Sequence, residues 1–472
     1  MCQGRQSCRR LSQSDLDAAK RRPNSCVITI DGRAYDVANF LCRHPGGALA
    51  LENCRGQDAS VQFSMYHPEL VRKFLPTYCI GQIEPCELDD NVNEADNQPF
   101  SCGDVKHQQQ QSPIVRDYFA LRDKFHRMGL FQTKPTWELG LVLRILCLLA
   151  ASVACVLCPP ESAWPIRVVL AACILGIYLQ QLAFVGHDLG HTAVTHNRLT
   201  DHRLAAFLGN ALLGISIGWW KLNHNVHHLV TNSVTDDPDI QHMPLLAITD
   251  EFFSSPISTF YDGKRKPFFR LLMRVQHLVF YPVMCVARFY LYIRSYEHLI
   301  ALNQKRERRY FQVAELVSMS TFFIWYLTLA CQLPTWPQTI AFVLLSHAVS
   351  GLLHVQICIS HFPMAVCDYK NGLGTVDSDD GGHFIRSQVA STMDVDCPTW
   401  MDWFHGGLQF QLEHHLYPRL PRHHLRAAAP LVKEFCQKHG MNYVSLSFLQ
   451  SNIALYCRLR DVASKAADWR PE

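Results

Sequence analysis

The residues best able to do chemistry in this chain are histidines, grouped in three short clusters. The clusters repeat helical spacings, and a glutamine takes the first place of the third: His187 and His191; His224, His227 and His228; Gln411, His414 and His415. On a helix, residues three and four positions apart lie on one face within about 6 Å of each other. Imidazole is a good ligand for several transition metals. The spacing therefore predicts that each cluster contributes ligands to a metal site.

Four long apolar segments must position these clusters. Each approaches the length of about 20 residues that a helix needs to cross a bilayer. The segments are Leu139–Cys158, Ile166–Phe184, Val313–Leu333 and Thr339–Ser360. We therefore predict an α-helical multi-pass membrane region with about four transmembrane helices.

Two further apolar stretches are shorter or interrupted by polar residues. Leu204–Trp220 contains glycines, and Leu271–Ile293 is interrupted by arginine, glutamine and histidine. We expect both to be interfacial or half-buried helices. The run Trp219-Trp220-Lys221 is typical of the aromatic belt at a membrane surface.

Basic residues are unevenly distributed among the connections between these segments. The short connections 159–165 and 334–338 contain no Lys or Arg, whereas the long loop 187–312 and the C-terminal tail contain many. The positive-inside rule then places the long loop and the tail in the cytosol. All three histidine clusters would share that side, where they can converge on one site.

The composition excludes several other classes of protein. Hydrophobic residues make up 48% of the 472 residues and charged residues 18%, and the net charge of +3 gives no reason to expect nucleic acid binding. The 19 cysteines are scattered and odd in number, which favours reduced thiols over a secreted disulfide framework. Residues 1–24 lack the apolar core of a secretory signal peptide.

A separate soluble segment precedes the apolar ones. Val27–Ile30 followed by Asp31-Gly32 predicts a strand and a tight turn, and His44-Pro45-Gly46-Gly47 is followed by a second histidine, His67. Two imidazoles facing each other across an apolar slot would give a six-coordinate haem iron, which transfers electrons. The glycines would let the backbone pass close to a porphyrin edge. This segment resembles the cytochrome b5 haem-binding domain, and the resemblance implies haem ligation by His44 and His67.

These features divide the chain into four parts. We predict a polar tail (1–24), an α+β cytochrome b5-like domain (25–85), an acidic and glutamine-rich linker (86–112) and a membrane domain that carries the three clusters (113–472). Ile114–Leu130 has an amphipathic pattern that fits either a helix on the membrane face or an ordinary packed helix.

The haem domain, the paired apolar segments and the three clusters together resemble the front-end desaturases, which are membrane-bound fatty acyl desaturases with a fused cytochrome b5. Gln411 at the start of the third cluster is typical of that branch. The runs Trp219–His224, Asp236–His242 and Gly406–Gln411 are most similar to sphingolipid long-chain-base desaturases that act at the Delta-8 position. The acyl Delta-6, Delta-5 and Delta-8 desaturases share the same clusters, so an acyl lipid remains an alternative substrate.

The resemblance implies an oxygen-dependent desaturase with haem b and two non-haem irons. It also implies NADH-cytochrome b5 reductase as electron source, a membrane lipid as substrate, and the endoplasmic reticulum membrane with the haem domain and the clusters facing the cytosol. The implied iron ligands are the seven cluster histidines, His361 after the fourth apolar segment, and Gln411: His187, His191, His224, His227, His228, His361, Gln411, His414 and His415.

Several roles remain open in the sequence. Gln411 could ligate iron, hold a bound water or only donate a hydrogen bond. Asp188 and Glu413 could orient imidazoles or be solvated carboxylates, and His354 is expected to be a packing residue or a group that supports the ligands. Trp219, Trp220 and Lys221 are expected to line the mouth where the lipid head group is held. A lipid hydroxylase and a haem-bearing electron carrier without catalysis are the competing functions.

Overall fold

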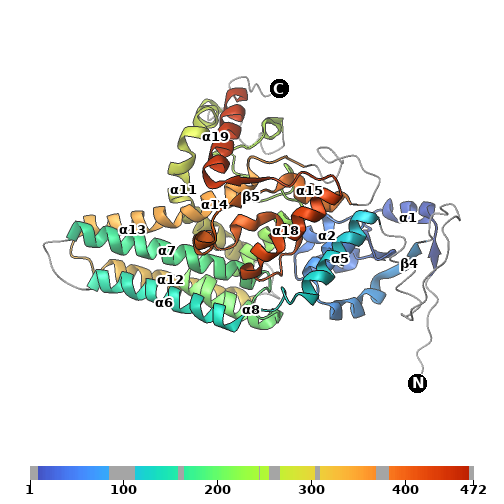
Figure 1. Cartoon of the computed structure of the whole chain (residues 1–472), viewed down its shortest axis with the longest axis horizontal. Coiled ribbons are helices and arrows are strands. Elements are labelled where there is room, and N and C mark those ends of the chain that lie inside the picture. The colour runs from blue at the N-terminus through green and yellow to red at the C-terminus, as the bar shows by residue number, and fades with distance from the viewer. Residues whose placement is uncertain are drawn as a thin grey trace.

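The computed structural model describes residues 9–83, 112–157, 164–243, 245–254, 266–302, 309–367 and 382–466. Long helices lie side by side at one end of the molecule, and a small domain with a sheet forms the other end (Figure 1). The C-terminal helices lie between them. The predicted linker 86–112 falls almost entirely outside the described residues.

The N-terminal domain is built on a four-stranded sheet. Its strands follow the order β1-β4-β3-β2, and β1 pairs with β4 in parallel. They are β1 (Arg10–Leu11), β2 (Val27–Ile30), β3 (Arg33–Asp36) and β4 (Cys79–Ile83). The predicted turn links β2 to β3, with positive φ angles of 48° at Asp31 and 66° at Gly32.

The structured domain begins before residue 25, where the sequence predicted a polar tail. Helix α1 (Gln13–Lys20) starts with a capping box between Ser12 and Asp15, and its Leu16 and Ala19 are buried against the sheet. A helix of eight residues with two buried side chains has too short an apolar pattern to stand out in the sequence.

Four short helices on this sheet carry the two histidines. They are η1 (Ala38–Arg43), α2 (Ala48–Glu52), α3 (Ser60–Tyr66) and η2 (Glu69–Tyr78). His44 follows η1 directly, and His67 follows α3.

The four predicted membrane spans are present as helices. They are α6 (Pro135–Leu157), α7 (Trp164–Gly190), α12 (Arg309–Ala330), and the pair α13 (Trp336–Ser350) with α14 (Leu352–His361). Only 17% of the most apolar window of α6 and 28% of that of α12 are buried, against 67% for α7. The apolar surfaces of α6 and α12 therefore face outward, as lipid contact requires, while α7 lies inside and leads to the first histidine cluster.

The stretch Leu271–Ile293 lies within α11 (Lys266–Leu302), which is 37 residues long. Two of its interrupting polar residues, Gln276 and Arg288, are buried and hydrogen-bonded. Gln276 bonds the backbone of Ala247, and Arg288 donates to Tyr292 Oη at 2.7 Å and to the Leu213 carbonyl at 2.7 Å. This agrees with the expectation of a half-buried helix.

The prediction of one helix across Leu204–Trp220 is wrong. The chain forms α8 (Arg198–Ala205), the π-helix η4 (Ala206–Leu212) and then α9 (Ile217–Leu229). Gly214 makes the break with a φ of +77°, and a Cβ there would lie 2.4 Å from the Phe322 ring. Ser216 then caps α9 by accepting a hydrogen bond from the Trp219 amide.

The remaining elements cover the inner ends of the spans. They are η5 (Asp250–Ser254), α15 (His383–Ser391), β5 (Asp394–Asp396), η7 (Thr399–Met401), α16 (Asp402–His405), η8 (Leu408–Phe410), α17 (Gln411–Leu416), α18 (Arg422–Lys438), β6 (Ser445–Ser447) and α19 (Phe448–Lys465). The amphipathic helix α5 (Pro113–Arg127) packs on this region: Tyr118 donates to the Leu416 carbonyl at 2.8 Å and stacks on Tyr417. Of the two readings of Ile114–Leu130, the structure therefore has the packed helix.

Candidate metal centre and haem site

The predicted ligands come from four helices that end or cross at one place. Helix α7 brings the first cluster at its C-terminal end, α9 the second, α17 the third, and α14 ends at His361. All nine predicted ligand residues meet there in two adjacent groups.

The first group, here the five-histidine cluster, consists of His187, His191, His224, His228 and His414. Their ligand nitrogens all lie within 4.8 Å of one another. His228 Nε2 is 3.1 Å from the Nε2 atoms of both His224 and His414. The Nε2 atoms of His187 and His191 are buried without a hydrogen-bond partner. Ring nitrogens that converge on one point and are not used in hydrogen bonds can act together as ligands of one cation.

The second group, here the three-histidine cluster, consists of His227, His361 and His415, again within 4.8 Å of one another. The Nε2 atom of Gln411 lies 3.0 Å from His361 Nε2. Both Gln411 Oε1 and His415 Nε2 are buried without a hydrogen-bond partner. This group can therefore offer three nitrogens and one amide oxygen.

Each of two helices divides its histidines between the clusters. On α9, His224 and His228 join the five-histidine cluster while His227 joins the other, because adjacent residues on a helix point about 100° apart. On α17, His414 and His415 separate in the same way. Each of these two sequence motifs therefore contributes to both groups, and this sharing holds the two groups side by side.

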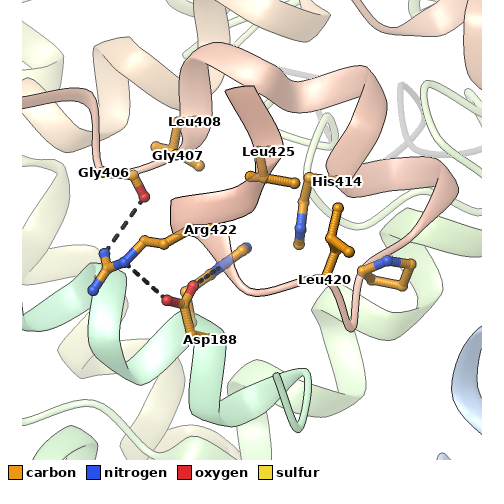
Figure 2. Close-up of a pocket in the computed structure, with 10 residues that line it drawn as sticks. Asp188, Gly406, Gly407, Leu408, His414, Leu420, Arg422 and Leu425 are labelled. Carbon is orange, nitrogen blue, oxygen red and sulfur yellow. Dashed lines mark hydrogen bonds and ion pairs between the residues drawn. The ribbon is translucent and has the colours of Figure 1, made fainter. Parts of the chain in front are cut away.

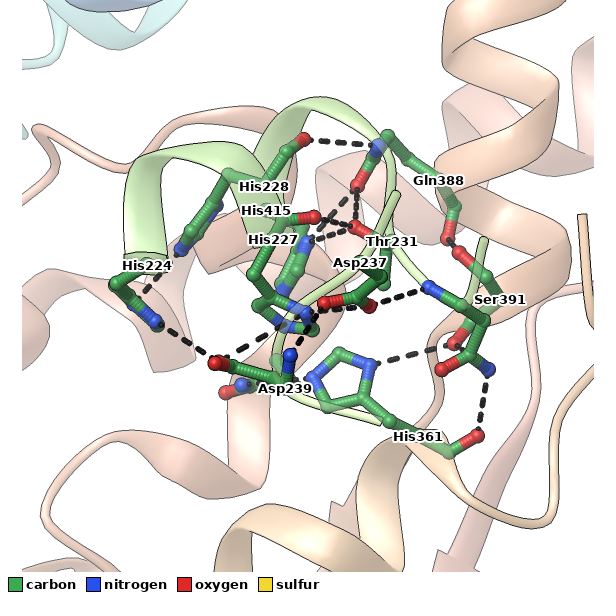
Figure 3. A network of polar contacts seen from close by, with 12 residues as sticks. His224, His227, His228, Thr231, Asp237, Asp239, His361, Gln388, Ser391 and His415 are labelled. Atoms are coloured by element: carbon green, nitrogen blue, oxygen red, sulfur yellow. Dashed lines mark hydrogen bonds and ion pairs between the residues drawn. The ribbon is translucent and has the colours of Figure 1, made fainter. Parts of the chain in front are cut away.

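Several acceptors fix the rings from the outside (Figure 3). Asp237 accepts from His227 Nδ1 at 2.9 Å, Gln388 Oε1 from His415 Nδ1 at 2.8 Å, and the Ser391 carbonyl from His361 Nδ1 at 3.3 Å. Asp239 lies 3.6 Å from His224 Nδ1. A bond at Nδ1 leaves Nε2 free as the ligand atom.

The sequence did not identify these outer acceptors. Asp237 and Asp239 carried a signal, since they closely follow the second sequence cluster, but nothing in the local sequence marks Gln388.

The structure also decides the suggested roles of Asp188 and Glu413. Asp188 lies a long 3.5 Å from His187 Nδ1 and pairs with Arg422 at 2.9 Å. Glu413 is fully buried and accepts a hydrogen bond from Tyr443 Oη at 3.0 Å, so among the described residues it holds a tyrosine rather than an imidazole, and it is not a solvated carboxylate.

The electrostatic setting keeps most of these imidazoles neutral. Burial lowers the pKa values of His191, His228, His414 and His415 well below the ordinary value, and that of His224 to about 3. Burial opposes a charge on His227 too, but Asp237 and Asp239 outweigh it and raise the pKa of His227 to about 9. Neutral imidazole is the ligating form, and carboxylates behind it favour a cation. The donor set therefore fits two iron ions.

The histidines left outside the predicted ligand set stay outside both clusters. Among those that the structure describes are His196, His202, His242, His347, His354, His383, His405, His423 and His424. His354 is half-buried in α14, and its Nε2 atom is enclosed.

In the N-terminal domain, His44 and His67 face each other with ring centroids 6.0 Å apart. His44 Nδ1 donates to the Gly47 carbonyl at 3.0 Å, and His67 Nδ1 donates to the Phe63 carbonyl at 3.1 Å. Each Nε2 is therefore the free nitrogen. A Cβ on Gly46 would lie 2.9 Å from the His44 ring, so glycine is required for this approach.

The surroundings of the pair suit a large apolar ligand. Leu49, Leu70 and Phe74 are exposed by 44%, 62% and 66% on the helices around the two histidines. Burial lowers the pKa of His44, and burial together with the neighbouring His44 lowers the pKa of His67 to about 4. Two neutral imidazoles beside exposed apolar side chains fit a bis-histidine haem.

The N-terminal domain packs directly on α9. Val226, Leu229 and Val230 of α9 belong to the same apolar core as Phe63 and Ala50 of the domain. A Cβ on Gly47 would lie 3.0 Å from the Leu222 side chain. Helix α9 thus has its apolar face on the haem domain while its histidines face the metal clusters.

Trp220 lies on the metal side of α9. Its ring stacks on His224 with centroids 4.4 Å apart and also contacts His187 and His191. The expectation that Trp219-Trp220-Lys221 forms an aromatic belt is therefore wrong for Trp220. The sequence placed the Trp pair at the end of an interfacial helix, whereas the pair lies in the first turn of α9, which begins at Ile217.

Comparison with known proteins agrees with this geometry. Residues 162–447 match the family model "Fatty acid desaturase", and residues 12–84 match "Cytochrome b5-like Heme/Steroid binding domain". The chain is 37% identical over 448 residues to a Delta(8)-fatty-acid desaturase of Helianthus annuus, covering 94% of this chain and 90% of the relative. It is 36% identical over 451 residues to an acyl-lipid (9-3)-desaturase of Borago officinalis, covering 95% and 92%. A Delta 8-(E)-sphingolipid desaturase of Emericella nidulans is 43% identical over 305 residues, covering 63% of this chain and 54% of the relative.

Proposed function

The chain belongs to the fatty acid desaturase family and carries a cytochrome b5-like domain, and on this basis we propose that it desaturates the long-chain base of sphingolipids at the Delta-8 position. The observation that carries the proposal is the pair of histidine clusters, built on shared helices beside a bis-histidine haem site. Similarity to the Delta 8-(E)-sphingolipid desaturases of Emericella nidulans and Kluyveromyces lactis supports the choice of substrate.

The reaction removes two hydrogens from neighbouring methylene carbons and leaves a double bond. One dioxygen, two electrons and two protons complete the balance and yield two waters. Two iron ions supply the oxygen chemistry that removes hydrogen from unactivated methylenes. The protein's own part is to hold the imidazoles in fixed orientations through Asp237, Gln388 and the Ser391 carbonyl.

We assign one iron to the five-histidine cluster and the other to the three-histidine cluster with Gln411. His44 and His67 would hold the haem, which would supply electrons one at a time. The packing of the haem domain on α9 supports a route through that helix, whose diameter with side chains is about 10–12 Å.

The setting of the enzyme follows from the same features. It is a multi-pass membrane protein, and we place it in the endoplasmic reticulum with the haem domain and both clusters facing the cytosol, where NADH-cytochrome b5 reductase would reduce the haem. The basic residues of the long loop and the tail support this orientation. We retain the division into haem domain, linker 86–112 and membrane domain 113–472, with the haem domain beginning near residue 10.

Expression in a host that lacks Delta-8 long-chain bases, followed by profiling of both sphingoid bases and fatty acids, tests the proposal. We expect new double bonds in long-chain bases. New double bonds confined to fatty acyl chains would contradict the sphingolipid substrate and favour the acyl alternative, which the similarity to the Borago acyl-lipid enzyme supports. A His228→Ala variant is the control for background activity.

A further inference from the structure

A cavity of about 370 Å³ lies beside the five-histidine cluster. Its walls come from the start of α6, the inner part of α7, and the segments around α16, η8 and α18. It therefore sits at the inner end of the first two spans, where a lipid in the bilayer can present its head group. None of Trp219, Trp220 and Lys221 lines it.

The lining carries more positive than negative charge. Lys134, Arg144, Arg422 and Arg426 contribute four cations, and Asp402 contributes one carboxylate. Asp402 is already engaged, because it pairs with Arg426 and accepts from Gln409 Nε2 at 3.0 Å. Lys134 and Arg144 have no carboxylate partner within the described part of the chain, and Arg144 makes only a 3.5 Å contact with Gln181 Oε1.

Arg422 is the buried member of this set. Its side chain is 6% exposed, its Nε pairs with Asp188 at 2.9 Å, and its Nη1 donates to the Gly406 carbonyl at 3.4 Å (Figure 2). Among the described residues its buried Nη2 has no hydrogen-bond partner, and the guanidinium lies over the rings of Trp137 and Phe184. A buried guanidinium with an unused donor costs free energy unless an acceptor arrives. Lysine and arginine side chains only donate, so the complementary ligand is rich in acceptor oxygens.

The cavity and the five-histidine cluster are close neighbours. Gly406, Gly407 and Arg422 line both the cavity and a narrow hollow that reaches His187 and His414. Gly406 has a φ of +59°, and a Cβ there would lie 2.1 Å from the Phe184 ring. A head group held in the cavity would therefore fix how far along the lipid chain the clusters can act.

We propose that this cavity binds a phosphate-bearing head group of the lipid substrate, held by Lys134 and Arg144 beside the buried guanidinium of Arg422. Phosphate matches the two uncompensated cations and the forked geometry of guanidinium. The inference rests on the proposed desaturase function only in naming the bound lipid as the substrate, and it leaves open whether the phosphate is carried by a sphingolipid or a glycerolipid.

The test is binding to the purified full-length protein, measured by tryptophan fluorescence because Trp137 and Trp403 line the cavity. The probes are short-chain ceramide 1-phosphate, the matching ceramide, and dioctanoyl phosphatidylcholine. Lys134→Gln and Arg144→Gln each remove one cation. Arg294→Gln is the control, because Arg294 lies on α11 and pairs with Glu297 away from the cavity.

We expect a phosphate lipid to bind about tenfold more tightly than ceramide, and each cavity variant to reduce that binding about threefold to tenfold. The control should bind like the wild type. If phosphatidylcholine binds and the same cavity variants weaken its binding, the result supports the head-group site and indicates a glycerolipid substrate. The long-chain-base proposal would then fail while the head-group proposal stands. Equal or tighter binding of neutral ceramide, or cavity variants that bind like the control, would overturn the inference.

Discussion

At the scale of single residues, the site depends on which nitrogen of each imidazole is used by the protein. His227, His361 and His415 all bind protein acceptors through Nδ1, and the acceptors are a carboxylate, a backbone carbonyl and an amide oxygen. Each bond fixes both the tautomer and the ring orientation. Three rings from three helices can then meet within 4.8 Å without a loop having to order.

Asp237→Asn tests this outer support. Asp237 is fully buried and accepts from His227 Nδ1, the Asn232 amide and the Asp239 amide. Asparagine loses the charge and presents an amide nitrogen to one of these donors. We expect iron affinity or activity to fall about 10–100-fold, with the haem spectrum unchanged. Iron analysis of the purified variant measures this.

The matched control for this variant is Asp236→Asn, because Asp236 is the adjacent carboxylate and accepts a hydrogen bond from Thr235 Oγ1 at 2.6 Å. Full iron content and activity in Asp237→Asn would show that His227 is held by its packing alone.

Gln411→Ala tests the one ligand position that is not histidine. Its Nε2 lies 3.0 Å from His361 Nε2, and its Oε1 has no hydrogen-bond partner, so the amide faces the three-histidine cluster. Alanine can neither bind a metal nor hold a water. We expect most activity to be lost while the protein remains folded, inserted and haem-loaded. Turnover measured against haem content decides the question, and wild-type turnover would make Gln411 a packing residue.

Sequence reasoning succeeded for residues with a periodic local signal. The nine predicted ligands lie together because their spacings and neighbouring apolar segments are local features. It failed where a contact joins distant parts of the chain, as between Gln388 and His415, or Glu413 and Tyr443. It also treated each cluster as one unit, whereas the rotation between neighbouring helical residues sends His227 and His228 to different clusters.

At the scale of elements, α9 is the helix on which the molecule depends most. Leu222, Val226, Leu229 and Val230 recur at helical spacing and face the haem domain, while His224 and His228 face the metal cluster. The sequence placed the spans correctly from length and hydropathy. It missed the start of α9, because the break at Gly214 lies inside a continuous apolar run.

Leu222→Asp tests the contact between the haem domain and α9. Leu222 meets Gly47 beside His44, and a charge there would oppose close packing. We expect haem and iron contents to stay unchanged while reoxidation of the reduced haem in a single turnover slows at least about tenfold. Stopped-flow absorbance of the haem measures the rate.

Leu449→Asp is the control, because Leu449 is 69% exposed on α19. An unchanged rate of haem reoxidation in Leu222→Asp would mean that electrons reach the clusters by a path other than this contact.

At the scale of the whole molecule, the haem domain and the histidine clusters lie on different faces of the same helix, α9. The haem domain covers the apolar face of α9 so completely that Val226 is 3% exposed and Leu229 is 7% exposed. A separate cytochrome b5 would find that face occupied. The fused domain therefore acts as the built-in donor, and its sheet and helices serve to present His44 and His67 next to α9.

His67→Ala tests this arrangement. His67 lies outside both clusters, so its loss should remove the haem spectrum and leave two irons per chain. Turnover should stop, because the clusters receive no electrons. The haem-free domain should still cover α9, so adding soluble cytochrome b5 with its reductase should restore little activity to His67→Ala. The double variant Leu222→Asp with His67→Ala should recover more activity, because its domain packs less closely on α9. Activity, iron content and haem absorbance are measured on the same preparations. A single variant that keeps a six-coordinate haem spectrum, or works without haem, would contradict the assignment, and equal rescue of both variants would contradict the covered face.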